Sequence, residues 1–242
     1  MNKTYEGRIR HLHLLGGARE ARGLSVIIDV FRAFSLESYL YAMGAKEIRP
    51  VGTIEDTLSL HKMFPGSVLI GERKGVKCEG FDFGNSPSQV RPEAVKGKCI
   101  LHTTSAGTQG IIAAENADEL LTGSFTTASA IAEYIKKRNP QEVSLVSMGS
   151  MGTQKTPEDE LCAEYIACLL RGETMPDLEE KLLAMRENGA KKFFDPAQQS
   201  VFPEQDFWMC IRHDIFDFVL KVQKDEYGFT ARKVEVNSGS KV

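Results

Sequence analysis

LSVIID, residues 24–29, is an apolar run rich in β-branched side chains that ends in a carboxylate. Such a run is typical of a buried strand. The short VFRA segment follows it, and the residues from Ser35 to Met43 then predict a helix because their apolar side chains recur on one face. A strand followed by a helix is the unit from which parallel sheets are built, so this stretch indicates an α/β fold.

The same alternation continues outward from this stretch. Expected strands cover residues 8–14, 47–51, 68–71, 99–102, 120–121 and 143–147, and expected helices start near Thr53, Gly107 and Thr126. Farther along, helices are expected at 157–170, 178–187 and 206–211, with strands at 216–223 and 230–236 and a frayed end at 238–242. We predict a mostly parallel sheet flanked by helices on both faces, with a C-terminal helical segment and a β-hairpin. Residues 1–242 are expected to form a single compact unit. The alternative is a division near residue 150, into a strand–helix core (1–150) and helices plus hairpin (151–242).

Composition excludes several classes of protein. The net charge of −3 over 242 residues argues against bulk nucleic-acid binding, which needs a basic face. No apolar run approaches the roughly 20 residues that cross a membrane, and the N-terminus lacks an apolar signal core. The five cysteines show no C-x-x-C spacing, which indicates free thiols in a reducing cytoplasm and no zinc cluster. A homodimer is one assembly that these features permit.

Small polar segments follow several of the expected strands. In open α/β sheets, ligands bind outside the carboxyl ends of the strands, so these segments are expected to converge. Their acids, cations, hydroxyls and glycines suit a small anionic, phosphorylated substrate. They are DVFRA (29–33), GERKG (71–75), FGNSP (83–87), HTTSAGT (102–108) and GSF (123–125).

The charged members of these segments allow two interpretations each. Asp29 can hold Mg²⁺ and Arg32 can clamp an anion, or the two can be a helix cap and its partner. Glu72 can be a metal ligand or an acid–base group, and Arg73 and Lys74 add positive field. A solvated run of charges explains the same residues.

The uncharged members could bind anions through hydroxyls and backbone N–H groups at helix starts, or could simply cap those helices. The candidates are Asn85, Ser86, Thr103, Thr104, Ser105, Gly107, Thr108 and Ser124. His102 is a minor candidate for an acid. A P-loop, a G-x-S-x-G elbow and a G-x-G-x-x-G fingerprint are all lacking in the sequence.

Acidic residues also open the expected helix at 157–170. Glu158 and Asp159 near a helix N-terminus are ordinary helix chemistry. The alternative places one of them at a metal ion or at an attacking water.

The order and spacing of these segments resemble the 2-phosphosulfolactate phosphatase family from about Ser25 to Val219. The segments that match are DVFRA, GER (71–73), EGFDFGNSP (79–87), TTSAGT (103–108), GSF and EDELCA (158–163), of which EGFDFGNSP is the most distinctive. The chain departs from the expected family pattern at Phe34, Ser105-Ala106 and Thr127, which concerns the exact substrate more than the reaction type.

The resemblance implies Mg²⁺-dependent hydrolysis of 2-phospho-3-sulfolactate to 3-sulfolactate and phosphate, a step of coenzyme M synthesis in methanogens. The resulting hypothesis assigns the metal to Asp29 and to Glu158 or Asp159, with Glu72 as a further candidate. Arg32 and Arg73 would stabilise phosphoryl oxygens and other anions. An aspartyl-phosphate on Asp29 is the main variant. The rivals are a phosphatase for another phospho-acid and a non-catalytic anion-binding protein or sensor.

Overall fold

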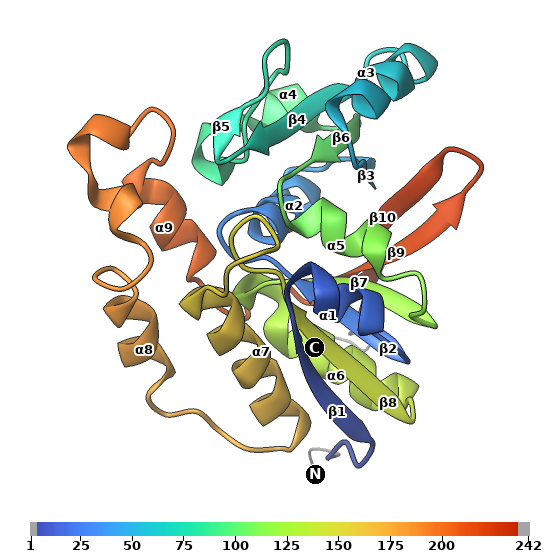
Figure 1. Ribbon diagram of the computed structural model, residues 1–242, viewed down its shortest axis with the longest axis vertical. Helices are drawn as coiled ribbons and strands as arrows, with labels where there is room; N and C mark the ends of the chain where they lie inside the picture. The colour runs from blue at the N-terminus through green and yellow to red at the C-terminus, as the bar shows by residue number, and fades with distance from the viewer. Residues whose placement is uncertain (1–3, 237–242) are drawn as a thin grey trace, which may run out of the picture.

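A ten-stranded sheet runs through the protein, for which a computed structural model describes residues 4–236 (Figure 1). The strand order is β1-β8-β2-β7-β9-β10-β3-β6-β4-β5. The strands are β1 (Arg8–His13), β2 (Leu24–Ile28), β3 (Glu47–Pro50), β4 (Val68–Arg73), β5 (Val76–Lys77), β6 (Cys99–Thr103), β7 (Glu119–Gly123), β8 (Glu142–Ser147), β9 (Phe218–Asp225) and β10 (Gly228–Glu235).

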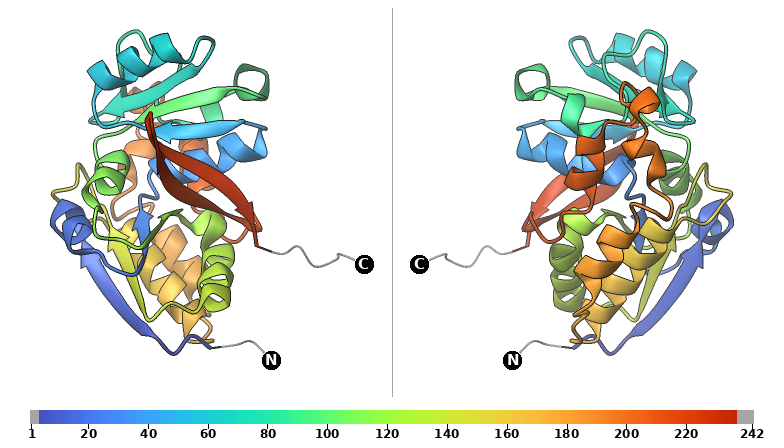
Figure 2. Two further views of the ribbon diagram at one scale, coloured as in Figure 1. Left: turned by 90° about the vertical axis from the view of Figure 1, so that its right-hand side faces the viewer. Right: turned by 90° about the vertical axis from the view of Figure 1, so that its left-hand side faces the viewer.

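Two blocks of parallel strands make up most of the sheet. One contains β1, β8, β2 and β7, and the other contains β3, β6 and β4. The antiparallel hairpin β9–β10 lies between them and pairs with β7 on one side and β3 on the other (Figure 2). The predictions of an α/β fold, a mostly parallel sheet and a C-terminal hairpin are confirmed.

The helices follow the predicted alternation with some additions. They are α1 (Leu14–Glu20), α2 (Ala33–Ala42), α3 (Ile54–Met63), α4 (Pro92–Val95), α5 (Gly107–Ala113), α6 (Ala128–Arg138), α7 (Pro157–Leu170), α8 (Leu178–Ala184) and α9 (Glu204–Cys210). The sequence reasoning missed α1, α4 and β5. The expected strand at 68–71 is longer in the structure, because Glu72 and Arg73 extend β4 and pair with β5. The expected frayed end at 238–242 lies outside the described residues.

Local chemistry explains where several elements begin and end. The Thr53 hydroxyl accepts a hydrogen bond from the Asp56 N–H at 3.0 Å, which caps the start of α3 as the sequence predicts. Gly44 follows α2 with φ +89°, a backbone conformation that favours glycine. These caps set the direction in which each helix returns to the sheet.

The central strand β2 is buried along its whole length. Val26 and Ile28 belong to one apolar cluster with residues of α6 and α7, whereas Ile27 belongs to another with residues of α1 and α5. This alternation follows the two-residue period of a strand. Helical cover on both faces of the whole sheet stays a prediction.

The register of the sheet brings three strand ends together. Ile28, the last residue of β2, pairs with Gly123 of β7 and with Ser147 of β8. Segments that follow these strands therefore start from one edge of the sheet. None of the helices within residues 4–236 has the length and apolar character needed to cross a membrane.

Candidate active site

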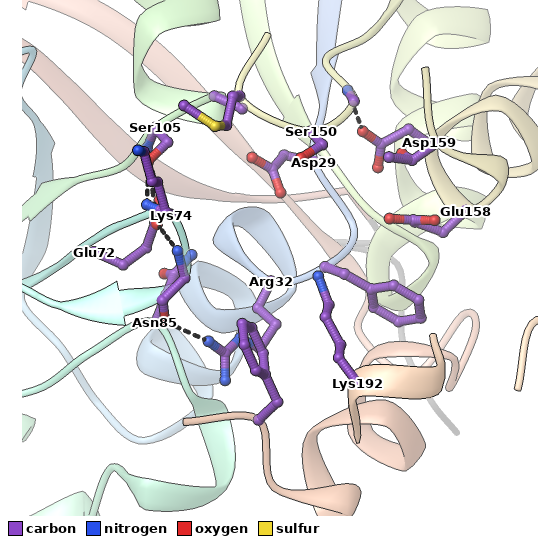
Figure 3. A pocket seen from close by; sticks show the side chains of 17 residues that line it. Asp29, Arg32, Glu72, Lys74, Asn85, Ser105, Ser150, Glu158, Asp159 and Lys192 are labelled. Carbon is purple, nitrogen blue, oxygen red and sulfur yellow. Dashed lines mark hydrogen bonds between the residues drawn. The ribbon is translucent and has the colours of Figure 1, made fainter. Parts of the chain in front are cut away.

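One cavity of about 220 Å³ lies where the segments after β2, β4 and β8 meet the start of α7 (Figure 3). Such strand ends are the usual ligand position in an open α/β sheet. The residues that line it are Asp29, Phe31, Arg32, Glu72, Lys74, Gly75, Asn85, Ser105, Ala106, Gly149, Ser150, Met151, Thr156, Glu158, Asp159, Lys192 and Phe202.

Three carboxylates are buried on one side of this cavity. Asp29 follows β2, and Glu158 and Asp159 lie in the first turn of α7; each side chain is almost fully removed from solvent. Burial raises the pKa of Asp29 to about 7, and the nearby charge of Glu72 contributes to the rise. Burial, followed by repulsion from Asp29 and Glu158, also raises the pKa of Asp159 well above its usual range.

Asp159 connects the segment that follows β2 with the segment that follows β8. One of its oxygens accepts the Val30 N–H at 2.8 Å and the other accepts the Gly149 N–H at 2.7 Å. Glu158 differs, because its Oε2 is buried without a hydrogen-bond partner in the described part of the chain. A buried carboxylate oxygen without a partner is costly, so this atom is open to a cation or a proton.

Glu72 holds the loop on the opposite side. Its two oxygens accept the Ser105 N–H at 2.6 Å and the Gly75 N–H at 2.5 Å, and the Ser105 hydroxyl donates to it at 3.1 Å. Ser105 also accepts the N–H of Lys74 at 3.1 Å. Glu72 therefore fixes two loops that carry cavity residues.

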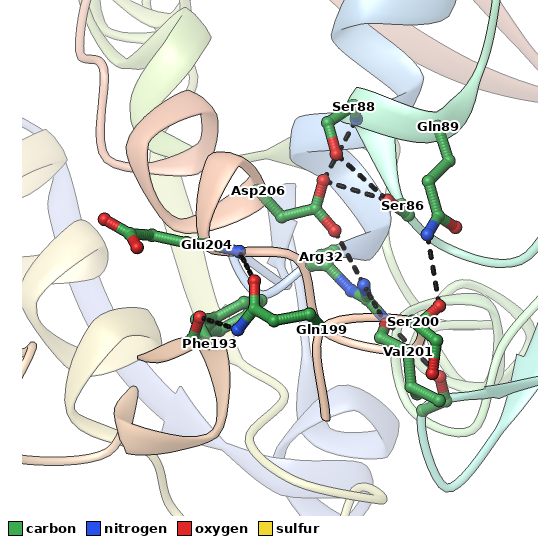
Figure 4. A network of polar contacts seen from close by, with 11 residues as sticks. Arg32, Ser86, Ser88, Gln89, Phe193, Gln199, Ser200, Val201, Glu204 and Asp206 are labelled. Carbon is green, nitrogen blue, oxygen red and sulfur yellow. Dashed lines mark hydrogen bonds and ion pairs between the residues drawn. The ribbon is translucent and has the colours of Figure 1, made fainter. Parts of the chain in front are cut away.

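Arg32 lines the cavity but is paired within the protein. Its Nη1 donates to Asp206 Oδ2 and to the Val201 carbonyl, both at 2.7 Å (Figure 4). Asp206 also accepts the Ser86 hydroxyl at 2.9 Å and the Ser88 N–H at 3.0 Å. The guanidinium lies 4.8 Å from the ring centre of Phe202, so it is stacked as well as paired.

Other predicted binding residues point elsewhere. Arg73, one residue after Glu72 in β4, donates to the Gly52 carbonyl and to the Thr103 hydroxyl. Thr104 and Thr108 bond to each other at the start of α5. Ser124 bonds to Thr126. Of the predicted substrate-binding residues, Asn85 and Ser105 line the cavity, and Arg73, Ser86, Thr103, Thr104, Gly107, Thr108 and Ser124 do not.

Gly107 nevertheless affects the site by having no side chain. A Cβ at this position would lie 2.9 Å from Asp29 Oδ2 and 3.0 Å from Phe34 Cζ. The glycine thus lets the start of α5 approach the Asp29 carboxylate closely.

One known family matches this chain over most of its length. A family model described as 2-phosphosulpholactate phosphatase matches residues 13–225. The chain belongs to the 2-phosphosulfolactate phosphatase family. A "Probable 2-phosphosulfolactate phosphatase" of Bacillus subtilis (strain 168) is 33% identical over 91% of this chain and 93% of its own length. A protein with the same description from Thermotoga petrophila is 34% identical over 81% of this chain and 87% of its own length.

Membership of the 2-phosphosulfolactate phosphatase family confirms the expected class, a phosphatase that acts on a phosphate monoester. It also gives meaning to cavity residues that the sequence reasoning did not select. Gly149, Ser150 and Met151 follow β8, so the rule that ligands bind at strand ends could have found them.

Lys192 is the most important omission. It lies in a short 3-10 helix (Lys191–Phe194) in the C-terminal part of the chain, and Figure 3 shows its ammonium directed toward Asp29 and Glu158. Burial lowers the pKa of Lys192, and Glu158 acts in the opposite direction. No motif distinguishes it from neighbouring surface lysines.

The donor set can be compared with the needs of Mg²⁺. Within residues 4–236, no three His, Cys, Asp or Glu side chains form a ready-made metal cluster. Mg²⁺ usually takes only one or two carboxylates and completes its shell with waters and substrate phosphate. Asp29 and the unpartnered oxygen of Glu158 fit that requirement.

Proposed function

We propose that this protein hydrolyses 2-phospho-3-sulfolactate to 3-sulfolactate and phosphate with the help of Mg²⁺. The observation that carries the proposal is the group of buried carboxylates that shares one cavity with Lys192 and Lys74. Acids that repel one another suit a divalent cation, and lysines suit the anions of the substrate. Both requirements arise in hydrolysis of a multiply charged phosphate ester.

Asp29 and Glu158 would hold the cation, which when bound offsets phosphate charge and orients water. Asp159, whose oxygens are bonded to Val30 and Gly149, keeps the strand ends in place around them. Lys192 would bind phosphoryl oxygens from the opposite wall. The guanidinium of Arg32 stays paired with Asp206 and forms part of the cavity wall.

Phosphate release from a panel of phosphorylated hydroxy acids, with and without EDTA, tests the proposal. We expect release from 2-phospho-3-sulfolactate that EDTA abolishes and added Mg²⁺ restores. The Asp29→Asn protein, purified in the same way, controls for contaminating phosphatases. Absence of metal-dependent release from every substrate in the panel would favour the non-catalytic anion-binding alternative.

Two chemical routes remain within the proposal. In the first, water attacks the phosphorus, the P–O bond to the ester oxygen breaks, and 3-sulfolactate leaves with a proton from the water. In the second, Asp29 attacks the phosphorus and the ester oxygen leaves as the hydroxyl of 3-sulfolactate after taking up a proton; water then hydrolyses the aspartyl-phosphate to phosphate and the Asp29 carboxylate. Labelled phosphate trapped on the acid-quenched protein would select the second route, and its absence under turnover would select the first.

We also propose several further properties that the sequence leads us to expect. They are a single compact unit with helices on both faces of the sheet, a cytoplasmic location, a homodimer, no nucleic-acid partner, and a place in coenzyme M synthesis.

A further inference from the structure

A line of three polar side chains runs from the protein interior to the cavity wall. Glu37 comes from α2, His102 from β6, and Asn85 from the loop after β5. Glu37 and His102 are fully buried, whereas Asn85 lines the cavity. The His102 Nδ1 lies 2.8 Å from Glu37 Oε1, and its Nε2 lies 2.9 Å from Asn85 Oδ1.

Packing alone gives little reason for this arrangement. Buried polar groups cost free energy unless their hydrogen bonds are complete. Glu37 Oε2 is buried without a partner in the described residues, so the network is not fully satisfied. An apolar set of side chains would fill this space at lower cost, which suggests that the network acts on the residue at its end.

The network determines which end of the Asn85 amide faces outward. His102 has a partner at each ring nitrogen, so the ring is held in one orientation by Glu37. The atom that faces Nε2 is the Asn85 amide oxygen, and because an amide oxygen only accepts, we assign the donated N–H to Nε2. This arrangement turns the amide nitrogen away from the ring. Within residues 4–236, the Asn85 Nδ2 has no hydrogen-bond partner, and it belongs to a residue of the cavity wall.

The position of Asn85 in the cavity indicates what this NH₂ group meets. Figure 3 shows Asn85 on the side of Glu72 and Lys74, opposite Glu158 and Asp159. The oxygens of Glu72 already accept N–H groups of Gly75 and Ser105. The Glu72 carboxylate is therefore engaged by the backbone, and the donors that remain for an anion at this end of the cavity are the Asn85 NH₂ group and the Lys74 ammonium.

We propose that Glu37 and His102 are positioning residues that direct the Asn85 NH₂ group at an oxyanion of the substrate. Because the acids and their cation take the phosphate at the opposite end, this oxyanion is the carboxylate or sulfonate that is not transferred. The assignment rests on the proposed function for the direction in which the substrate lies. A reversed amide would present its oxygen and repel the same group.

Two substitutions of His102 separate positioning from packing. In His102→Gln, the side-chain amide N–H takes the position of the histidine Nε2–H, so a hydrogen bond can still be donated to the Asn85 oxygen. His102→Asn places its amide near Nδ1, keeps a partner for Glu37 and loses that donor. Loss of one hydrogen bond to a charged group changes affinity roughly ten- to hundredfold. We expect KM to rise by that factor in His102→Asn and in Asn85→Ala, with kcat changed by less than about threefold, and to stay near wild type in His102→Gln.

Combining the substitutions tests whether the two residues act as one unit. The double variant with Asn85→Ala and His102→Asn should show no higher KM than Asn85→Ala alone. The control is His61→Asn, which removes a 2.8 Å hydrogen bond to Ser67 outside the cavity wall and should leave KM unchanged. Urea midpoints show whether each variant is folded. KM effects that multiply in the double variant, or an unchanged KM in Asn85→Ala, would overturn the proposal.

Calorimetric binding of 3-sulfolactate separates this proposal from the proposed function. Binding that Asn85→Ala and His102→Asn both weaken, in a protein without turnover, supports the positioning role and rejects the proposed hydrolysis of 2-phospho-3-sulfolactate. Turnover with unweakened 3-sulfolactate binding in both variants rejects the positioning role alone. If the wild-type protein neither turns over the substrate nor binds 3-sulfolactate, both proposals fail.

Discussion

Arg32 and Asp29 are only three residues apart, yet they illustrate two treatments of buried charge around one cavity. Arg32 meets Asp206 at 2.7 Å and stacks on Phe202, so its charge is balanced within the protein. Asp29 lines the same cavity as Glu158 and Asp159. Burial and the charge of Glu72 raise the pKa of Asp29, and burial together with Asp29 and Glu158 raises the pKa of Asp159. The ion pair of Arg32 and Asp206 stabilises the fold, whereas the cluster of Asp29, Glu158 and Asp159 is suited to binding a positive ion.

The largest expected effect is the loss of catalytic activity when Asp29 is replaced. Asp29→Asn should lower metal-dependent phosphate release by roughly 10²- to 10⁴-fold, because it removes a carboxylate placed at the reacting phosphate. The same variant should unfold at the same or higher urea concentration in EDTA, since one repelling charge is gone. A variant that retains full activity would remove Asp29 from the mechanism, whichever chemical route is followed.

Asp206→Asn should produce the opposite pattern, a loss of stability. The substitution leaves the buried Arg32 guanidinium without its counter-charge, and breaking such a pair typically costs about 3–5 kcal/mol. Urea unfolding at pH 7.5 would measure it. Glu20→Gln is the matched control, because Glu20 is exposed and lies 3.9 Å from Arg10, and it should leave stability almost unchanged. Equal effects of the two substitutions would contradict a structural role for Asp206.

The smallest expected effect is on how the free energy of unfolding depends on pH, through the Asp29 carboxyl group. Burial and Glu72 raise the pKa of Asp29 from 3.8 to about 7, so its protonated form is favoured in the folded protein. The stability it contributes is therefore fully present below about pH 4 and is lost as pH rises through about 7.

We compare the free energies of unfolding of the wild type and of Asp29→Asn in EDTA. The wild-type value minus the variant value should fall by on the order of 2–4 kcal/mol as the pH rises across this window. Urea titrations of both proteins between pH 4 and pH 8 measure this difference. A difference that stays constant with pH would show that the Asp29 carboxyl is not perturbed in the folded protein.

Neighbouring residues show how far the sequence could predict the site. Glu72 and Arg73 follow the same apolar run, and the sequence favours both equally. In β4 successive side chains point to opposite faces, so Glu72 reaches the cavity and Arg73 reaches Gly52 and Thr103 instead. The strand-end rule locates a segment, but the phase of the strand decides which residue of it faces the ligand.

Lys192 marks a different limit. It reaches the cavity because the C-terminal segment folds back over the strand ends, and Phe202 arrives by the same path. Local sequence carries no trace of such long-range placement. His102 is similar, since its partners Glu37 and Asn85 lie in other elements and only the fold brings them within hydrogen-bond distance.

By itself, the sequence determined the alternation of strands and helices, the polar segments at the strand ends and the family to which their order belongs. These features depend on local patterns of hydrophobicity, turn residues and motif spacing. Only the tertiary structure decided that the hairpin β9–β10 divides the parallel strands and that Asp206 balances Arg32. It also decided that, within residues 4–236, the buried Oε2 of Glu158 has no hydrogen-bond partner. Strand pairing and charge balance depend on which distant groups are desolvated together, and no local stretch of sequence records that.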